Sequence, residues 1–285
     1  MYAVTGASGP LGHLTIESLL ASGVTADQIV AVVRTTSKAD DLAARGVVVR
    51  HGDYDDPATL TGALAGVERL LLVSGNEPGR RMPQHTAVVD AAVAAGVRHL
   101  AYTSATRADT TRLVLAPEHK ATEELIVASG LSYTFLRNSW YHENYTRQLG
   151  QYLAQGAVVS AAGDGRVSGA SRADYAAAAS ATLVGDGHDN KVYELGGPAY
   201  TMADLAATIS EVAGTEVVDK EVSNAELIEI LRGAGMDEGT AGFVAALDEA
   251  TARGDLEVDP SVLEGLLGRP VTPLVDVVRA AYQAL

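Results

Sequence analysis

The sequence predicts an α/β fold: a doubly wound parallel sheet followed by a smaller, mostly helical C-terminal lobe. Apolar runs alternate with helical patterns through the first half of the 285 residues, a glycine-rich turn joins the first run to the first helix, and the pattern becomes mostly helical after Gly196-Gly197-Pro198. We therefore expect a larger domain over residues 1–197 and a lobe over 198–285, with 138–170 contributing to a cleft between them.

Six apolar runs predict the strands of the first domain. They cover residues 2–5, 29–33, 47–50, 70–73, 98–103 and 131–137. The run IVAVV at 29–33 is apolar throughout, as expected of a strand buried on both faces of a parallel sheet. Helices are expected between the strands at 10–22, 57–64, 84–95 and 117–128. A further short helical stretch is expected after the second strand and ends at Ala44.

The second half changes character. We expect a helix at 140–153, a short strand at 157–160, a helix at 174–183 and a strand at 191–195 that returns to the main sheet. Helix starts are then signalled by Thr201, by Ser223 with Glu226 as a capping box, and by the pairs Asp259-Pro260 and Thr272-Pro273.

Composition restricts the class of function. The formal net charge of −15 argues against nucleic acid and anionic membrane as partners. The absence of cysteine excludes disulfides and thiolate chemistry, and the seven histidines are scattered without metal-ligand spacing, so no metal site is expected. Without a signal peptide or an apolar run near 20 residues, the expected location is the cytoplasm.

The turn after the first strand predicts a dinucleotide site of the Rossmann type. Gly6 allows a sharp reversal, Gly9 leaves bare backbone for a pyrophosphate, and Gly12 lets the helix pack close to the sheet. The helix N-terminus then faces the phosphates. The spacing G-x-x-G-x-x-G is that of chains like the short-chain dehydrogenases/reductases; the alternative is an ordinary strand–turn–helix corner.

Cofactor choice is expected to depend on Arg34, at the end of the second strand. NAD sites usually have an acidic residue there, whereas a guanidinium favours the 2′-phosphate of NADPH, by roughly 10- to 100-fold. Thr35, Ser37 and Lys38 support this interpretation, and a solvated surface arginine is the alternative. Asp53 and the turn Ser74-Gly75-Asn76 follow the third and fourth strands, where they either contact the cofactor or only form turns.

The catalytic residues are less evident. None of the eleven tyrosines is followed four residues later by the lysine of the usual reductase pair, although Thr103 and Ser104 stand where such enzymes keep a serine. His119 is a candidate proton donor, with a plain helix-surface histidine as the alternative, and Lys120 is expected to be solvated. The missing pair favours a reaction in which hydride transfer is the hard step and the product takes its proton from water.

The segment LRNSWYHENY at 136–145 is the second informative stretch. It holds the only tryptophan, two tyrosines and two asparagines, and it follows the sixth strand at the ligand-binding edge of the sheet. Flat aromatic walls with a few amide donors suit a planar, conjugated acceptor. The alternative, compatible with the first, is that Trp140 and Tyr141 hold the two domains together.

The chain resembles the NmrA-like group of atypical short-chain dehydrogenases/reductases. Within it the chain is most similar to type 2 NADPH:quinone oxidoreductases, with triphenylmethane reductases next. The resemblance is carried by TGASGPLGHLTIESLL, QIVAVVR, PQH, AYTSATRADT, YTFLRNSWYHENY and SRADYAAAA, and it extends through KVYEL into the C-terminal lobe. Pro10 replaces a usual glutamine and Ser139 a usual glycine.

The resemblance implies NADPH bound through 6–11, Arg34, 74–76 and 138–143, with a quinone stacked near the nicotinamide and Asn144 as a polar contact. With the residues singled out above, the expected cofactor-binding set is Gly6, Ala7, Ser8, Gly9, Pro10, Leu11, Gly12, Arg34, Lys38, Asp53, Ser74, Gly75, Asn76, Thr103, Asn138, Ser139, Trp140, Tyr141, His142 and Glu143.

We expect two-electron reduction of a quinone, with Asn144, Tyr141 and His119 as the candidate catalytic residues. One alternative is an NADP-binding redox sensor that acts through a protein partner without turnover. Another is a reductase of triphenylmethane or azo dyes, which differs only in the shape of the acceptor pocket. Whether the chain forms a homodimer is left open.

Overall fold

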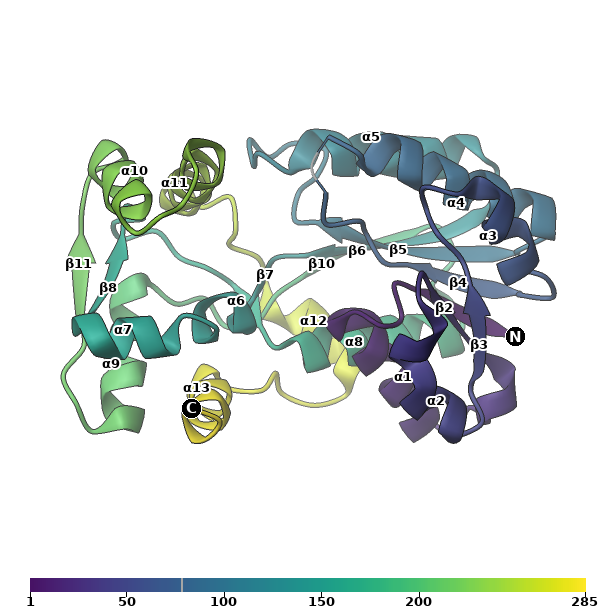
Figure 1. The fold of residues 1–285 in the computed structure, drawn as a ribbon, viewed down its shortest axis with the longest axis horizontal. Coiled ribbons are helices and arrows are strands. Elements are labelled where there is room, and N and C mark those ends of the chain that lie inside the picture. The colour runs from purple at the N-terminus through teal and green to yellow at the C-terminus, as the bar shows by residue number, and fades with distance from the viewer. Residues whose placement is uncertain (78) are drawn as a thin grey trace.

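The computed structural model describes residues 1–77 and 79–285, and its larger part is built on one parallel sheet of seven strands (Figure 1). The strand order is β10-β6-β5-β4-β1-β2-β3, and every neighbouring pair is parallel. This confirms the doubly wound fold, in which ligands bind where the strand order reverses, here between β1 and β4. The strands are β1 (Tyr2–Thr5), β2 (Ile29–Val33), β3 (Val48–His51), β4 (Arg69–Leu72), β5 (His99–Ala105), β6 (Ser132–Asn138) and β10 (Lys191–Leu195).

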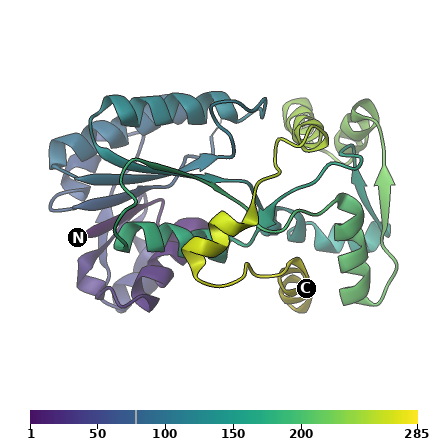
Figure 2. The same cartoon turned by 180° about the vertical axis from the view of Figure 1, so that it is seen from behind.

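Helices cover both faces of this sheet and bury a separate hydrophobic core on each side. One face carries α3 (Pro57–Ala63), α4 (Arg81–Ala95) and α5 (Ala116–Ala128). The other face carries α1 (Pro10–Ala21), α2 (Asp40–Ala44), α8 (Arg172–Val184) and α12 (Pro260–Leu267), with short 3-10 turns at Ala26–Gln28 and Thr36–Ala39 (Figures 1 and 2). β2 is buried along its whole length, as its apolar sequence predicts.

The smaller lobe lies beyond the carboxyl edge of the sheet and has its own hydrophobic core (Figure 1). Its two-stranded sheet pairs β8 with β11 in parallel. The elements are α6 (His142–Thr146), α7 (Leu149–Gln155), β8 (Ala157–Ser160), α9 (Met202–Ala213), β11 (Val218–Glu221), α10 (Asn224–Gly233), α11 (Glu238–Ala252) and α13 (Leu274–Gln283).

The chain crosses between the two parts several times. Between the lobes, β7 (Trp140–Tyr141) pairs with β9 (Gly169–Ala170) in a separate two-stranded sheet, so residues 142–168 start and end at this small sheet. Later α12 returns to pack on α8 and β10, whereas α13 packs on α6 and α9 of the lobe. The expected division at 197/198 therefore marks one crossing among several. In the described part of the chain, no helix is both long and apolar enough to cross a bilayer.

Two local expectations were wrong, and one strand was missed. The helix expected at 140–153 is instead the strand β7 followed by the two short helices α6 and α7, because Trp140 and Tyr141 pair with β9. Strand β11 was not foreseen: its four residues, VDKE, are exposed and carry no apolar signal. Helix α13 begins at Leu274, after Pro273 as N-cap. Thr272 does not cap it, because its N–H and hydroxyl both donate to the buried Asp174 carboxylate.

Candidate active site

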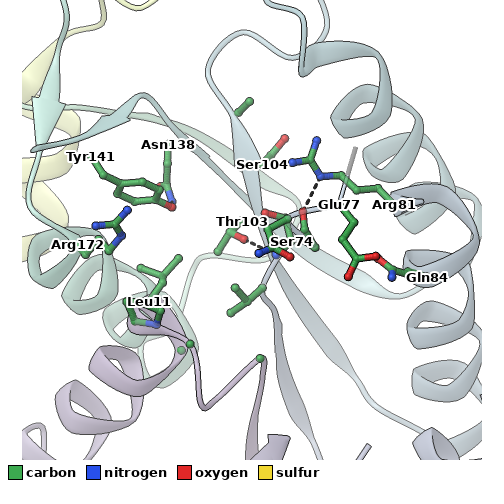
Figure 3. A pocket seen from close by; sticks show the side chains of 18 of the residues that line it. Leu11, Ser74, Glu77, Arg81, Gln84, Thr103, Ser104, Asn138, Tyr141 and Arg172 are labelled. Atoms are coloured by element: carbon green, nitrogen blue, oxygen red, sulfur yellow. Dashed lines mark hydrogen bonds between the residues drawn. The ribbon is translucent and has the colours of Figure 1, made fainter. Parts of the chain in front are cut away.

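A cleft of about 630 Å³ opens along the carboxyl edge of the main sheet, on the side of the smaller lobe. That volume is typical of ligand-binding pockets. Its walls come from the ends of β1, β2, β4, β5 and β6, from the starts of α1 and α4, and from the segment around α6 with Arg172. Figure 3 shows Tyr141, Asn138 and Arg172 on one side of this space, facing Ser74 and Thr103 on the other.

The glycine turn forms one end of the cleft. Gly6 has a φ of +57°, which an L side chain rarely adopts, and its carbonyl oxygen accepts the Gly9 N–H at 2.8 Å. A Cβ on Gly12 would lie 2.5 Å from that same oxygen, so only glycine lets α1 start this close to the turn. No side chain caps α1, whose first N–H groups lack helical partners and are free to bind an anion.

Two cations, Arg34 and Lys38, line the cleft beyond β2. The Arg34 side chain is 67% exposed, and its guanidinium lies 3.9 Å from the Glu77 carboxylate. Asp53, which also lines the cleft, accepts the Asp55 N–H with its carboxylate and so stabilises its own turn. This end of the cleft therefore combines open backbone N–H groups with two exposed positive charges.

Side chains of three other residues hold the turn 74–76 in place by hydrogen bonds. Thr103 Oγ1 accepts the Ser74 N–H at 2.8 Å, and His85 Nε2 accepts the Gly75 N–H at 3.0 Å. Arg81 Nε donates to the Gly75 carbonyl oxygen at 2.7 Å (Figure 3). Burial lowers the pKa of His85 to about 4, with Arg81 acting in the same direction, so the ring stays neutral and can accept.

An aromatic wall follows β6. The Tyr141 ring stacks under the Arg172 guanidinium, 4.7 Å from its centroid, and meets the Tyr175 ring edge-on at 5.3 Å. Asn138 Nδ2 donates to the Tyr141 hydroxyl at 3.4 Å, but within residues 1–77 and 79–285 its buried Oδ1 has no partner. A buried acceptor without a partner is costly, and a ligand donor in the cleft would satisfy it.

Asn144 lines the cleft next to this wall with a fixed orientation. Arg172 donates from a terminal guanidinium nitrogen to Asn144 Oδ1 at 2.8 Å. Both Glu143 carboxylate oxygens accept the Arg172 backbone N–H, at 2.9 and 3.1 Å, and the carboxylate lies 3.6 Å from the guanidinium. Because arginine only donates, the carbonyl side of the Asn144 amide is occupied and its two N–H groups remain for a ligand.

His119 also lines the cleft, but its environment disfavours proton donation. Its Nδ1 lies 2.7 Å from the Tyr102 hydroxyl, and only 4% of the residue is exposed. Burial, together with the nearby Arg81 and His85, lowers the pKa of His119 to about 3. At neutral pH the ring carries no extra proton to give away.

Most of the expected site residues come together in the cleft, and three do not. Ala7 is buried beneath the turn, His142 turns into the smaller lobe and contacts the Tyr200 hydroxyl at 3.1 Å, and Glu143 binds the first N–H of α8. Lys120 is exposed outside the lining. The remaining members of the expected set line the cleft: Gly6, Ser8, Gly9, Pro10, Leu11, Gly12, Arg34, Lys38, Asp53, Ser74, Gly75, Asn76, Thr103, Asn138, Ser139, Trp140, Tyr141 and Asn144.

Sequence reasoning missed several lining residues. Arg81 and Gln84 come from α4, which starts three residues earlier than expected, so the PQH motif lies inside the helix. Leu113 and Leu115 belong to the segment between β5 and α5, Arg147 lies between α6 and α7, and Arg172 begins α8. The motif SRADYAAAA contains Arg172 and was the available signal for it. Among the described residues, no group of three or more His, Cys, Asp or Glu side chains is arranged to hold a metal ion.

Comparisons with known proteins agree with this geometry. A family model described as NAD(P)H-binding matches residues 6–184. The chain is 47% identical to quinone oxidoreductase 2 of Escherichia coli over 98% of its own length and 97% of the relative's.

Solved structures extend the similarity to the fold. The crystal structure of NADPH-dependent quinone oxidoreductase from E. coli complexed with NADPH has a TM-score of 0.96 at 47% identity, covering 99% of this chain and 100% of that one. Triphenylmethane reductase of Citrobacter sp., complexed with NADP(H), has a TM-score of 0.94 at 41% identity, covering 99% and 100%. The chain belongs to the NAD(P)H-binding family and, within it, to the group of E. coli quinone oxidoreductase 2.

Proposed function

We propose that this protein is an NADPH-dependent oxidoreductase that transfers a hydride to a quinone. The observation that carries the proposal is a single cleft with a phosphate-binding corner and two cations at one end, and an aromatic wall with the oriented amide of Asn144 at the other. The similarity over nearly the whole chain to E. coli quinone oxidoreductase 2 supports the same reaction.

The residues at the glycine-turn end of the cleft fit NADPH. The N–H groups at the start of α1 would bind the diphosphate, and Arg34 with Lys38 would bind the 2′-phosphate. The unpartnered Oδ1 of Asn138 fits an amide donor such as the nicotinamide carboxamide. Bound there, NADPH supplies a hydride, which carries two electrons and one proton equivalent; with one further proton a quinone becomes a hydroquinone.

The chain's own residues bind and orient the acceptor. Asn144 would donate an N–H to a quinone oxygen, where negative charge develops as hydride arrives, and Arg172 would hold the amide in that orientation. Tyr141 would provide a flat face and a hydroxyl donor beside it. Because His119 is buried and uncharged, we assign the last proton to water rather than to a histidine.

One assay separates this function from a cofactor sensor. Adding 1,4-benzoquinone to protein and NADPH should give steady oxidation of NADPH at 340 nm, faster than with NADH at the same concentration. Tight NADPH binding in calorimetry without quinone-dependent oxidation would overturn the proposal in favour of a redox sensor.

A second candidate is the reduction of triphenylmethane dyes, favoured by the 41% identity and TM-score of 0.94 to the Citrobacter enzyme. Bleaching of such a dye with NADPH, compared with quinone reduction under the same conditions, ranks the two acceptors. We expect the quinone to be preferred, because the Asn144 amide suits a carbonyl oxygen that gains charge.

A further inference from the structure

A third cationic feature of the cleft, apart from the cofactor end, is Arg147. It follows helix α6 directly and stands three residues after Asn144, a spacing that places two residues on the same face of a helix. Both residues line the cleft, and Arg147 is exposed within it. Arg147 therefore lies at the acceptor end of the cleft, about one helical turn from the residue that we assign to the quinone oxygen.

Arg147 differs from the other arginines of the cleft in its surroundings. Arg34, Arg81 and Arg172 each lie within 4 Å of a glutamate carboxylate. Throughout residues 1–77 and 79–285, no carboxylate comes that close to Arg147, although acidic residues outnumber basic ones by 36 to 21 in the chain. Burial lowers the pKa of Arg172, the Glu143 carboxylate raises it, and the positive charge of Arg147 lowers it.

Apolar side chains lie beside this charge. Leu113, Leu115 and Trp140 line the cleft and belong to one hydrophobic cluster with Leu149, which is two residues beyond Arg147. A flat ring bound against these side chains would share the acceptor end of the cleft with Arg147. An anionic group on that ring would compensate the charge of Arg147 and reduce its repulsion of Arg172.

We propose that Arg147 selects acceptors that carry an anionic substituent, a carboxylate, sulfonate or phosphate, on the ring to be reduced. The inference rests on the proposed function, since it assigns a preference among quinones at the same site. It adds a specificity-determining cation at the acceptor end of the cleft, distinct from the cations expected to bind the cofactor phosphates.

The test compares two quinones in several variants. We would measure kcat/KM with NADPH for 1,2-naphthoquinone and for its 4-sulfonate, and take the ratio of sulfonate to parent. Differences in intrinsic reactivity cancel when this ratio is compared between proteins. A partly exposed ion pair changes affinity about two- to fivefold, so the ratio should fall by that factor in Arg147→Gln. In Arg147→Glu the ratio should fall about twice as far on a logarithmic scale, because the charge is reversed. In Arg147→Lys, which keeps the charge, the ratio should stay near the original.

The parent quinone is the internal control. Each variant's own kcat/KM for the parent is the reference for its ratio, and the preference for the sulfonate should weaken as salt is added. Arg232→Gln, on exposed helix α10 outside the cleft, changes the net charge equally and should leave the ratio unchanged. Equal ratios across the Arg147 series would overturn the inference, whereas absence of turnover with both quinones would overturn the proposed function instead.

Discussion

At the scale of single residues, Arg34 carries the choice of cofactor. Replacing it by alanine should reduce the preference for NADPH over NADH about tenfold, because one charge-assisted contact to the 2′-phosphate is lost from an exposed position. Calorimetric dissociation constants for both nucleotides measure the change. Arg45→Ala removes another exposed arginine, outside the cleft, and should leave the ratio of the NADH and NADPH dissociation constants unaltered. If this ratio were the same in both variants, Arg34 would not bind the 2′-phosphate.

Asn144 provides a second prediction at this scale. Asn144→Ala should lower kcat/KM for a quinone about three- to tenfold, since one neutral hydrogen bond to the acceptor is lost, while the dissociation constant of NADPH stays the same. Asn144→Asp keeps the contact with Arg172 but presents only acceptor oxygens. It should be at least as slow as the alanine variant. Normal kinetics in Asn144→Asp would mean that the residue serves only to hold Arg172.

The sequence predicted those cleft residues whose positions depend only on the local geometry of the backbone. The glycines at 6, 9 and 12 and Arg34 line it because a strand–turn–helix unit fixes their positions. Neighbours in an aromatic run were harder to assign: Trp140 and Tyr141 face the cleft, but the next residue, His142, faces Tyr200 in the smaller lobe. That direction depends on where β7 gives way to α6, and the sequence carries no marker for this point.

At the scale of elements, the contact between α1 and the glycine turn leads to a prediction about stability. In Gly12→Ala the new Cβ would meet backbone atoms of residues 6 and 7 at 2.5–2.9 Å, which cannot move aside as a side chain could. We expect a loss of about 1–3 kcal/mol in the free energy of unfolding by urea, together with weaker NADPH binding.

The matched control is Gly62→Ala in helix α3. A Cβ there meets nothing within 4 Å, so the higher helix propensity of alanine should leave stability unchanged or raise it by up to about 1 kcal/mol. If both variants were equally stable, the close approach of α1 to the turn would not be what requires glycine at residue 12.

Local sequence patterns predicted the elements that carry their own signal, such as an apolar run or a capping box. They failed where an element forms only through contact with a distant segment of the chain. The strand at 29–33 and the capping box at Ser223 were predicted from the sequence and are present. β11 is a strand because it pairs with β8, which is 58 or more residues earlier in the chain, and its exposed residues have no pattern of their own. Likewise, the role of Thr272 depends on the distant Asp174.

At the scale of the whole molecule, a polar network that is buried at Arg137 and Glu123 and exposed at Arg107 connects the sheet to the smaller lobe. Arg137 on β6 binds the Glu123 carboxylate with two nitrogens, at 2.9 and 2.7 Å, and Glu194 on β10 at 3.0 Å. Glu194 in turn accepts the Arg107 N–H, and the Arg107 guanidinium donates to carbonyl oxygens of residues 254 and 257 after α11. These contacts join β6 and β10 of the main sheet to the segment that follows α11.

Both parts of the molecule also bury histidines that folding keeps neutral. His85 and His119 lie beneath the sheet's carboxyl edge, and His142 lies in the smaller lobe; at most 4% of each is exposed. Burial lowers their pKa values from 6.5 to about 4, 3 and 4, respectively. Asp219 and Asp248 act in the opposite direction, because burial raises the pKa of both carboxyls, whereas burial lowers the pKa of His99 and His188 as it does for the three rings above.

Acid should therefore destabilise the protein well above the range in which most carboxylates protonate. Between pH 6.5 and 4 the unfolded chain binds protons at His85, His119 and His142 that the folded chain does not, so the stability present at pH 7 falls as pH falls. Each histidine should contribute a loss of about 1–2 kcal/mol between pH 7 and pH 5, measurable as a drop in the urea midpoint. In His142→Asn the loss of stability between pH 7 and pH 5 should be smaller by about 1–2 kcal/mol, whereas His51→Asn, at an exposed position, should leave it unchanged. A urea midpoint that stays constant from pH 7 to 5 would show that these rings accept protons without unfolding.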